Sequence, residues 1–502
     1  MKALLLFRNR DFDPDAPLSP LSDALRQDLE LEPIFSAMAD GDETVDATVR
    51  AVLLQESLPE EDIAYRQAVL SDCLARPDSV RALYGMVGDA LADITKFGGW
   101  SVLYSFPDSI LAMASARLQL CAGHLGALRR FAQQQAGSFS SEGFRTFFSM
   151  LEKELDDEYL AGMNEHLSRL SFPDGVLAGA VLGEGLQSTG WQLLQEEEKK
   201  KGLFHRLGDR LPLRRDPFRF EVPHGDESGT KAVDAIKDKI INETANAAAQ
   251  STEHILSFLN ALKTELAFYI GCLNLYGRLR ALDLPVCLPE VWPEKRPGCE
   301  AQGLYSVSLA LRDGAAPVKN GLCAADRTLV VLTGANQGGK TTLLRSVGQA
   351  QLMLQCGMFV GAESFSAGTC TGLFTHFKRE EDASMKSGKL DEELTRMSGI
   401  ISNLKPGGMV LLSESFSSTN EREGSEICRQ ITSALLESGV RIFTVTYLYQ
   451  FAAEMYEKHD PSHLFLQASR EEDGSRSFRI LPGEPVCTGF GQDLFHTIFA
   501  QD

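Results

Sequence analysis

The stretch from Leu329 to Val347 reads LVVLTGANQGGKTTLLRSV, and it decides the fold of the C-terminal part of the chain. Its first four residues are apolar and β-prone, which predicts a short buried strand, and the spacing of the apolar residues after Thr342 predicts a helix. The glycine-rich segment Gly334–Thr341 between them matches the pattern G-x-x-x-x-G-K-T in the context that the pattern requires, with a strand before it and a helix after it. The competing interpretation is a glycine-rich turn that matches by chance.

This segment has the chemistry of a phosphate-binding loop. Glycines let the backbone turn inward so that successive N–H groups face one anion. The helix that begins near Lys340 adds the positive end of its dipole. The Lys340 ammonium can reach the β- and γ-phosphates, and the Thr341 hydroxyl can ligate Mg²⁺. The predicted ligand is a nucleoside triphosphate with Mg²⁺, held by Gly334, Ala335, Asn336, Gln337, Gly338, Gly339, Lys340, Thr341 and Thr342.

Length and composition set the broad class. The chain has 502 residues, of which 43% are hydrophobic and 24% charged, as in a soluble globular protein of roughly two to four domains. No apolar run approaches the roughly 18 residues of a membrane span, so no membrane segment is expected. Ten cysteines without a C-x-x-C pair disfavour a disulfide framework or structural zinc and favour the reduced cytoplasm. The net charge of −20 opposes binding of nucleic acid over the whole surface, whereas a local basic patch stays compatible with it.

The pattern along the chain predicts a multidomain α plus α/β protein, in which a helical core and lever domain precede a P-loop domain. Residues 1–60 open with a strand-like segment and a helix over Leu21–Met38, and they lead into the core. Helical spacing dominates 61–171, and glycine-interrupted apolar runs predict a small β-hairpin within 172–230. One long helix, a lever of about 75 Å, and a proline-rich linker fill 231–298. Strands alternate with helices over 299–502, as in a sheet covered by helices.

The segment that follows the predicted hairpin is the one markedly basic region of an acidic sequence. A charged run at Glu196–Lys201 precedes several arginines. One interpretation is a contact for a nucleic-acid backbone, and the other is a solvated loop, which is what charge runs usually are. The candidate nucleic-acid contacts are Lys199, Lys200, Lys201, Arg206, Arg210, Arg214 and Arg215.

Three further segments bear on hydrolysis. The predicted strand over 407–412 leads to Ser413 and Glu414. In P-loop ATPases an acidic residue at the end of this strand supports Mg²⁺, and a following Glu polarises the attacking water. Ser413 can hold a magnesium-bound water but brings no negative charge. A third strand runs into Tyr447, where related ATPases often carry a His that senses the γ-phosphate. The pair Ser387-Gly388 opens a helix, and it can engage a phosphate or act as an ordinary helix cap.

The runs TGANQGGKTTLLRSVGQAQLMLQCGMFVGAE, LLSESFSSTNEREG, TVTYLYQFA and GEPVCTGFGQDL resemble the ATPase domain of the MutS mismatch-repair family. The helical region from 25 to 290 is similar to the family's core and lever domains, with 172–230 where the family carries its DNA clamp. The resemblance implies an ABC/MutS-type P-loop ATPase with ATP and Mg²⁺, Glu414 and Lys340 as catalytic groups, and Thr341 and Ser413 at the metal. It also implies a homodimer through the ATPase domains, with each phosphate site completed by the partner subunit's Ser387 and Gly388, and a role in DNA repair.

Several features depart from the family pattern. The chain begins almost at the core, so we expect no N-terminal mismatch-reading domain with its Phe-x-Glu wedge. Ser413 and Tyr447 predict a slow ATPase, because the loss of one magnesium-assisting carboxylate costs a few kcal/mol, or about 10²–10³ in rate. The preferred interpretation is an ATP-dependent, dimeric, cytoplasmic protein that clamps or senses DNA, including branched or mismatched DNA. The alternatives are a MutS paralogue that acts on ribosomes or structured RNA, and a non-catalytic assembly protein in which ATP only holds a dimer together.

Overall fold

Two compact units make up the chain in a computed structural model that describes residues 1–96, 107–170, 172, 176–182, 188–194, 222–223, 225–293, 296–379, 388–470 and 476–486. The α/β unit comprises 2–84, 137–147 and the described residues from 263 onward. The helical unit comprises the described residues of 85–136 and 148–262. The helices α5 (Pro77–Lys96), α7 (Glu142–Glu154) and α10 (Glu227–Ala281) contribute residues to both units.

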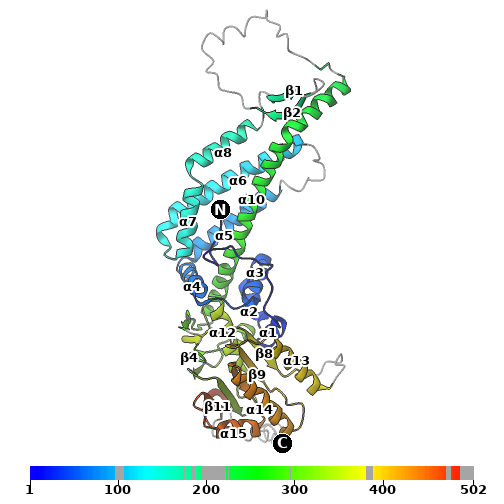
Figure 1. Ribbon diagram of the computed structural model, residues 1–502. Coiled ribbons are helices and arrows are strands. Elements are labelled where there is room, and N and C mark those ends of the chain that lie inside the picture. The colour runs from blue at the N-terminus through cyan, green and yellow to red at the C-terminus, as the bar shows by residue number, and fades with distance from the viewer. Residues whose placement is uncertain are drawn as a thin grey trace, which may run out of the picture. The chain divides into compact units, whose positions relative to one another are not determined.

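A six-stranded sheet forms the centre of the α/β unit, in the order β12-β11-β6-β10-β9-β8 (Figure 1). Its strands are β6 (Leu329–Gly334), β8 (Leu373–Phe377), β9 (Met409–Ser413), β10 (Arg441–Val445), β11 (His463–Arg470) and β12 (Arg476–Pro482). Neighbouring strands pair in parallel except β12, which is antiparallel to β11 at one edge. Every residue of β6, β8, β9 and β10 is buried, as expected for parallel strands covered on both faces.

Helices alternate with these strands, as the sequence predicted. They are α12 (Lys340–Gln355), α13 (Lys389–Asn403), α14 (Glu421–Glu437) and α15 (Tyr449–Glu457). A hydrophobic cluster joins three of them to the sheet through Met397 of α13, Cys428 of α14 and Phe451 of α15. Because the carboxyl ends of parallel strands meet at one edge, the loops after β6, β9 and β10 gather there.

A second, four-stranded mixed sheet was not predicted from the sequence. Its order is β3-β7-β4-β5, and its strands are β3 (Glu290–Trp292), β4 (Cys299–Leu304), β5 (Asn320–Cys323) and β7 (Ser364–Gly368), with α11 (Val307–Asp313) between β4 and β5. The strands have three to six residues. Runs this short show too few alternations to stand out from loops.

The N-terminal part of the α/β unit is helical, with α1 (Ser22–Asp28), α2 (Glu32–Ala39), α3 (Glu43–Leu54) and α4 (Glu60–Ala75). The single helix expected over Leu21–Met38 is wrong, because the chain leaves the helical conformation between Asp28 and Glu32. Glu30 has a φ of +52° there. Pro33 then lies in the first turn of α2, where its missing N–H breaks no hydrogen bond.

The helical unit contains α6 (Pro107–Gln135), α8 (Asp157–Arg169) and most of α10, and a short 3₁₀ turn (Ala136–Ser138) follows α6. Ion pairs join α6 to α10, between Asp108 and Lys237 and between Arg117 and Glu253. The strands β1 (Ala178–Leu182) and β2 (Ser188–Leu193) form an antiparallel hairpin. The predicted hairpin and the predicted long helix, of 55 residues, are both confirmed. The division into five segments drawn from the sequence stays a prediction.

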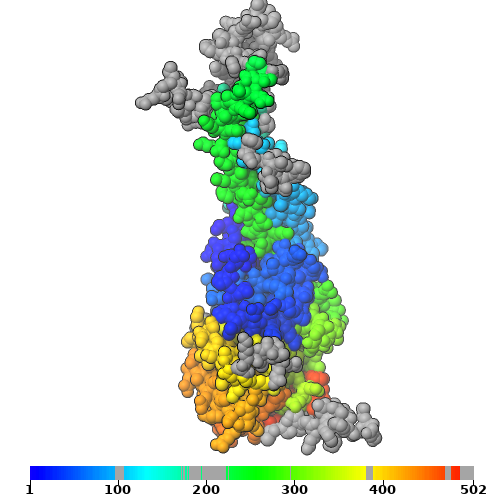
Figure 2. All heavy atoms as spheres, turned by 90° about the vertical axis from the view of Figure 1, so that its right-hand side faces the viewer, coloured from blue at the N-terminus to red at the C-terminus, as the bar shows by residue number. Residues whose placement is uncertain are grey.

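Among the described residues, α10 alone is long and apolar enough over one window to cross a membrane by length and composition. Within the protein, 67% of that window is buried. Burial against other parts of the same chain is what the core helix of a water-exposed fold also shows. Figure 2 shows α10 in green, the first helices of the α/β unit in blue, and its helices α13 and α14 in yellow to orange.

Residues 1–7 form no strand, which corrects the strand-like segment expected there, and a buried carboxylate takes the place of a neighbouring strand. Glu265 of α10 accepts hydrogen bonds from the N–H groups of Leu5 (2.6 Å), Leu6 (3.1 Å) and Phe12 (2.7 Å). The Tyr269 hydroxyl, one turn further along α10, donates to the Leu5 carbonyl at 2.6 Å. Side chains therefore satisfy the buried backbone groups that a sheet would otherwise pair.

We expect Glu265 to make stability depend on pH near neutrality. Burial raises the pKa of Glu265 to about 7 from a usual value of 4.5, although three N–H donors oppose the shift. The folded state therefore binds a proton more tightly than the unfolded state, so this contribution is fully present below about pH 4.5 and is lost as the pH rises through 7. The expected loss is on the order of 3 kcal/mol.

Urea unfolding of the wild type at several pH values between 5 and 8 should show this decline, and Glu265→Gln should flatten it. Glu243→Gln is the control, since Glu243 is an exposed carboxylate on the same helix. A wild type and a Glu265→Gln variant with parallel pH profiles would contradict the assignment.

Candidate nucleotide-binding site

The loop Gly334–Thr341 connects β6 to α12 in the strand-loop-helix order that the motif predicted. Gly334 and Gly339 have φ values of +100° and +87°, in the left-handed region that favours glycine, and Gln337 between them has +58°. At Gly338 a Cβ would lie 2.7 Å from the Cβ of Ala468 and 2.9 Å from the Ala335 carbonyl oxygen. A side chain at Gly338 would therefore force the loop backbone to shift from this arrangement.

Lys340, at the first position of α12, points into this loop. Its Nζ donates to the carbonyl oxygens of Gly334 (2.8 Å) and Ala335 (2.7 Å) and lies 4.7 Å from the centroid of the Tyr447 ring. Burial lowers the pKa of the Lys340 ammonium to about 8, and the negative charge of Glu414 opposes this. The ammonium is therefore held by weak, neutral partners, which phosphate oxygens can replace with charge-assisted hydrogen bonds.

Thr341, Ser413 and Glu414 come together because β6 and β9 both end at the same edge of the sheet. The hydroxyl oxygens of Thr341 and Ser413 are 3.4 Å apart. Mg²⁺ in nucleotide sites is usually bound by one or two carboxylates together with phosphate oxygens and water. The two hydroxyls can supply one ligand and one contact to a bound water, so a metal here would depend on the phosphates for its charge. No group of three or more His, Cys, Asp or Glu side chains in the described part of the chain is placed to hold a metal by itself.

Tyr447, which follows β10, lies near both of the charged groups assigned to catalysis. Its ring faces the Lys340 ammonium, and the Glu414 carboxylate is close enough to influence its hydroxyl. Partial burial, followed by the negative charge of that carboxylate, raises the pKa of Tyr447. Tyr447 is thus neutral at neutral pH, and its hydroxyl can act as a hydrogen-bond donor.

A cavity of about 440 Å³ opens beside the loop. One side is polar and consists of the loop itself from Gln337 to Leu343, together with Tyr447. The other side is apolar and is formed by Leu304, Leu309, Ala316, Pro317, Val318 and Phe478. A volume of this size with one polar and one apolar wall suits a flat ring attached to a charged group. Sequence reasoning missed the apolar wall, because its residues come from separate segments and none of them belongs to a motif.

Two groups of predicted site residues remain to be placed. Gly388 lies at the N-cap of α13, and its carbonyl accepts from the Glu392 N–H at 3.1 Å. A Cβ at Gly388 would meet no atom within 4 Å, so space does not require glycine there. Ser387 lies outside the described residues, as do all seven candidate nucleic-acid contacts between 199 and 215.

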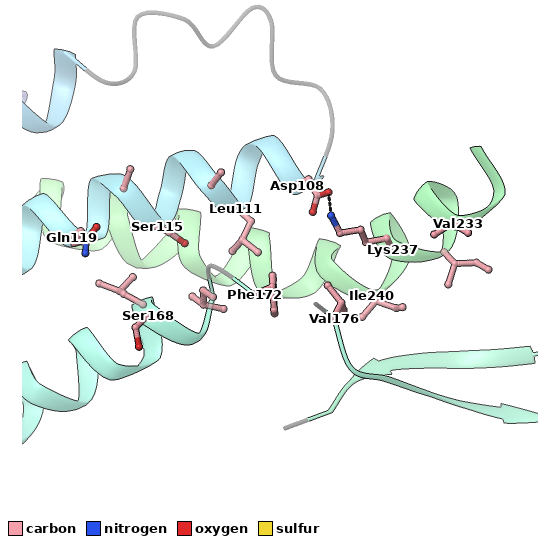
Figure 3. Close-up of a pocket in the computed structure, with 15 residues that line it drawn as sticks. Asp108, Leu111, Ser115, Gln119, Ser168, Phe172, Val176, Val233, Lys237 and Ile240 are labelled. Atoms are coloured by element: carbon pink, nitrogen blue, oxygen red, sulfur yellow. Dashed lines mark hydrogen bonds and ion pairs between the residues drawn. The ribbon is translucent and has the colours of Figure 1, made fainter. Parts of the chain in front are cut away.

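The helical unit has a larger cavity of its own, of about 950 Å³ (Figure 3). Side chains of α6, α8 and α10 line it, and most are apolar, for example Leu111, Phe172 and Ile240. The ion pair between Asp108 and Lys237 lies at one end of the cavity (Figure 3). Among the described residues that line the cavity, the charged side chains are Asp108 and Lys237, which pair with each other.

Comparison with known proteins relates both units to one family. Residues 59–282 match the model of the MutS2 N-terminal domain, and residues 330–484 match the model of MutS domain V. The chain is 30% identical over 160 residues to the DNA mismatch repair protein MutS of Porphyromonas gingivalis, an alignment that covers 31% of this chain and 18% of that protein. It is 26% identical over 160 residues to the endonuclease MutS2 of Brevibacillus brevis, covering 31% and 20%. It is 30% identical over 132 residues to the endonuclease MutS2 of Thermus thermophilus, covering 26% and 18%.

The parallel sheet, the glycine loop and the match to MutS domain V define the α/β unit as an ATPase-type domain. The two family models together cover about three quarters of the sequence, and the chain belongs to the MutS family. Its alignments span about a fifth of the length of the curated relatives that it matches.

We expect Gly338→Ala to weaken nucleotide binding at least tenfold, because the added methyl would meet both Ala468 and the Ala335 carbonyl. Titration of the full chain with a fluorescent ATP analogue measures this, with circular dichroism as the check on folding. Gly399→Ala is the matched control. Gly399 lies in α13, where a Cβ meets no atom within 4 Å, so the control should bind as the wild type does. Equal affinities for both variants would contradict the placement of the phosphates in this loop.

Proposed function

We propose that this protein is an ATP-dependent DNA-binding protein that acts in mismatch repair or related DNA metabolism, with ATP binding and hydrolysis coupled to clamping or sensing of DNA structure. The observation that carries the proposal is the loop Gly334–Thr341. Its glycines leave room for an anion, its lysine is held by replaceable carbonyl groups, and it lies at the N-terminus of a buried helix. These features together favour the triphosphate of a nucleotide over a smaller anion.

ATP would place its triphosphate in the loop, with Mg²⁺ near Thr341 and Ser413 and its base against the apolar wall of the adjoining cavity. Glu414 is the carboxylate closest in sequence to the end of β9, and it is the group that would orient the attacking water. Ser413 gives the metal no negative charge, so we propose that turnover is slow. Ser413 and Tyr447, which stand where related ATPases carry an acidic residue and a His, also favour a second candidate function. In this function ATP holds an assembly together without being hydrolysed.

The proposal extends to DNA binding, which the names of the relatives support, and to dimerisation, which the resemblance of the Ser387-Gly388 segment to the family implies. Two of the matched proteins are named MutS2 endonucleases, and one is named a DNA mismatch repair protein. We propose a homodimer through the ATPase domains, in which the partner subunit's Ser387 and Gly388 complete each phosphate site. We also propose that α10, which contributes residues to both units, carries the nucleotide-dependent change toward the basic segment at 199–215.

Two substitutions separate binding from hydrolysis. Lys340→Met removes the only ammonium at the loop among the described residues that line it, so affinity for an ATP analogue should fall at least tenfold. Glu414→Gln keeps the shape of the side chain but lacks its charge, so binding should persist while phosphate release falls about 10²-fold or more. Glu421→Gln, at an exposed carboxylate in the first turn of α14, is the control. A wild type that retains ATP with magnesium but releases no phosphate would support the non-catalytic assembly function.

The DNA-binding part of the proposal predicts a reduced salt dependence. Replacing Lys199, Lys200, Lys201, Arg214 and Arg215 with Gln should weaken binding, and it should lower the slope of log K against log salt by about 0.9 for each lost phosphate contact. Filter binding over duplex, mismatched, branched and single-stranded DNA at about 50 and 200 mM salt measures both. Lys405→Gln, in the α/β unit, is the control. Unchanged affinity and slope in the multiple variant would contradict a DNA contact at these residues.

A further inference from the structure

The loop that carries Glu414 has an unusual backbone. This catalytic loop, Ser413–Ser418, follows β9, and two of its residues have positive φ without being glycine: Glu414 (+54°) and Phe416 (+60°). This conformation is unfavourable for a residue with a side chain, and it persists where surrounding groups fix it. The Glu414 N–H donates to the Val445 carbonyl at 2.8 Å, which holds one side of the loop to β10.

Ser415, the residue next to Glu414, is held by His376 of β8. The Ser415 Oγ lies 2.7 Å from His376 Nδ1 and 2.9 Å from the His376 carbonyl oxygen. His376 is fully buried, and burial lowers the pKa of its imidazole to about 4, so the ring is neutral at neutral pH. Nε2 lies 3.0 Å from the Glu393 carbonyl oxygen, which can only accept. The ring proton is therefore assigned to Nε2, so His376 Nδ1 and the His376 carbonyl oxygen are two acceptors that share the single proton of the Ser415 hydroxyl.

Glu393 of α13 is linked to the catalytic loop in two ways. Its carbonyl oxygen lies 3.0 Å from Nε2 of His376, the residue that contacts Ser415, and its carboxylate accepts a hydrogen bond from the Ser418 hydroxyl at 2.9 Å. The Phe416 ring is buried and stacks on His376, with centroids 5.5 Å apart and planes at 23°. Ser415, Phe416 and Ser418 of the catalytic loop thus contact β8 or α13.

We propose that Glu393, His376 and Ser415 are positioning residues through which β8 and α13 hold Glu414 in the orientation that it needs to act on water. None of the three touches the nucleotide cavity described above, so each acts through the backbone of the catalytic loop. The inference depends on the proposed ATPase function for its catalytic readout. α13 begins directly after Gly388, and Glu393 lies in its first turns. A displacement of α13 at Gly388 could therefore reach Ser415, the residue next to Glu414, through two hydrogen bonds: Glu393 to His376 and His376 to Ser415.

Ser415→Ala tests the first step. It removes the hydroxyl between the two acceptors of His376, and we expect kcat to fall at least tenfold while affinity for a fluorescent ATP analogue stays within about twofold of the wild type. Amide hydrogen exchange of the peptide 409–418 should become at least tenfold faster. Thr432→Val is the matched control, since Thr432 is a fully buried hydroxyl residue of α14 in the same unit, and it should leave all three measurements unchanged.

A pair of variants at His376 tests whether the ring acts through these bonds. The amide of Asn lies near the place of Nδ1, so His376→Asn keeps a partner for Ser415. The amide of Gln lies near the place of Nε2, so His376→Gln keeps only the contact to Glu393. We expect kcat of the Asn variant to exceed that of the Gln variant at least threefold. A purely packing role would lower stability in both and give them the same kcat.

The outcomes separate this inference from the proposed function. If the wild type fails to bind the ATP analogue, the proposed function is wrong. If the wild type hydrolyses ATP and Ser415→Ala retains its kcat, the function stands and the positioning role is overturned. If the wild type binds without hydrolysis, hydrogen exchange decides: unchanged exchange over 409–418 in Ser415→Ala overturns the positioning role, and faster exchange supports it.

Discussion

A buried ammonium group, that of Lys340, is the interaction around which the C-terminal edge of the six-stranded sheet is arranged. An ion out of water needs compensating partners. The chain supplies two loop carbonyls, the face of Tyr447 and the nearby charge of Glu414, each from a different strand end. The carbonyls can turn away from the lysine when an anion arrives, and the glycines of the loop permit such a turn. The ammonium therefore has compensating partners in the absence of a ligand, and under the proposed function it would exchange the two carbonyl groups for phosphate oxygens.

The structure of the same edge also explains why the fold tolerates Ser413 at a position where P-loop ATPases usually carry an acidic residue. Ser413 replaces an acidic residue but still contacts Thr341, and the backbone of Glu414 is fixed by β10. The serine lacks the negative charge that a metal would use, so under the proposed function it would affect the rate of hydrolysis more than the shape of the site. Glu414 and Lys340 share Tyr447 as a neighbour, so a nucleotide in the loop would affect the three residues together.

Much of the fold and the phosphate loop could be predicted from the sequence, because the information is local. The loop, its strand and its helix are contiguous in the sequence, and apolar residues recur at helical spacing along much of the 55-residue helix. The apolar wall with Val318 and Phe478 could not be predicted, since it joins residues 304–318 to Phe478, which lies far away in the sequence. His376 and Glu393 were also missed. Their roles depend on the register that places His376 of β8 beside Leu412 of β9, and pairing between strands leaves no trace in either segment alone. In the sequence, Glu265 is only a polar residue among apolar ones. The N–H groups that it binds belong to residues more than 250 positions earlier in the chain.

The contacts between the two ends of the α/β unit set an order of events during synthesis. Arg345 of α12 donates to the Asp28 carbonyl at 2.9 Å and pairs with Glu30 at 2.8 Å. The N–H groups of Leu5 and Leu6 likewise have their acceptor, Glu265, much later in the chain. At about 5–20 residues per second, the ribosome needs roughly 15–60 s to make the 300 or so residues that separate such partners. During that time the apolar faces of α1 to α4 have no sheet to cover. We therefore expect the nascent chain to need chaperones that cover exposed apolar surface. The yield of folded protein should depend on translation speed more strongly than it does for a protein in which each domain is one contiguous segment.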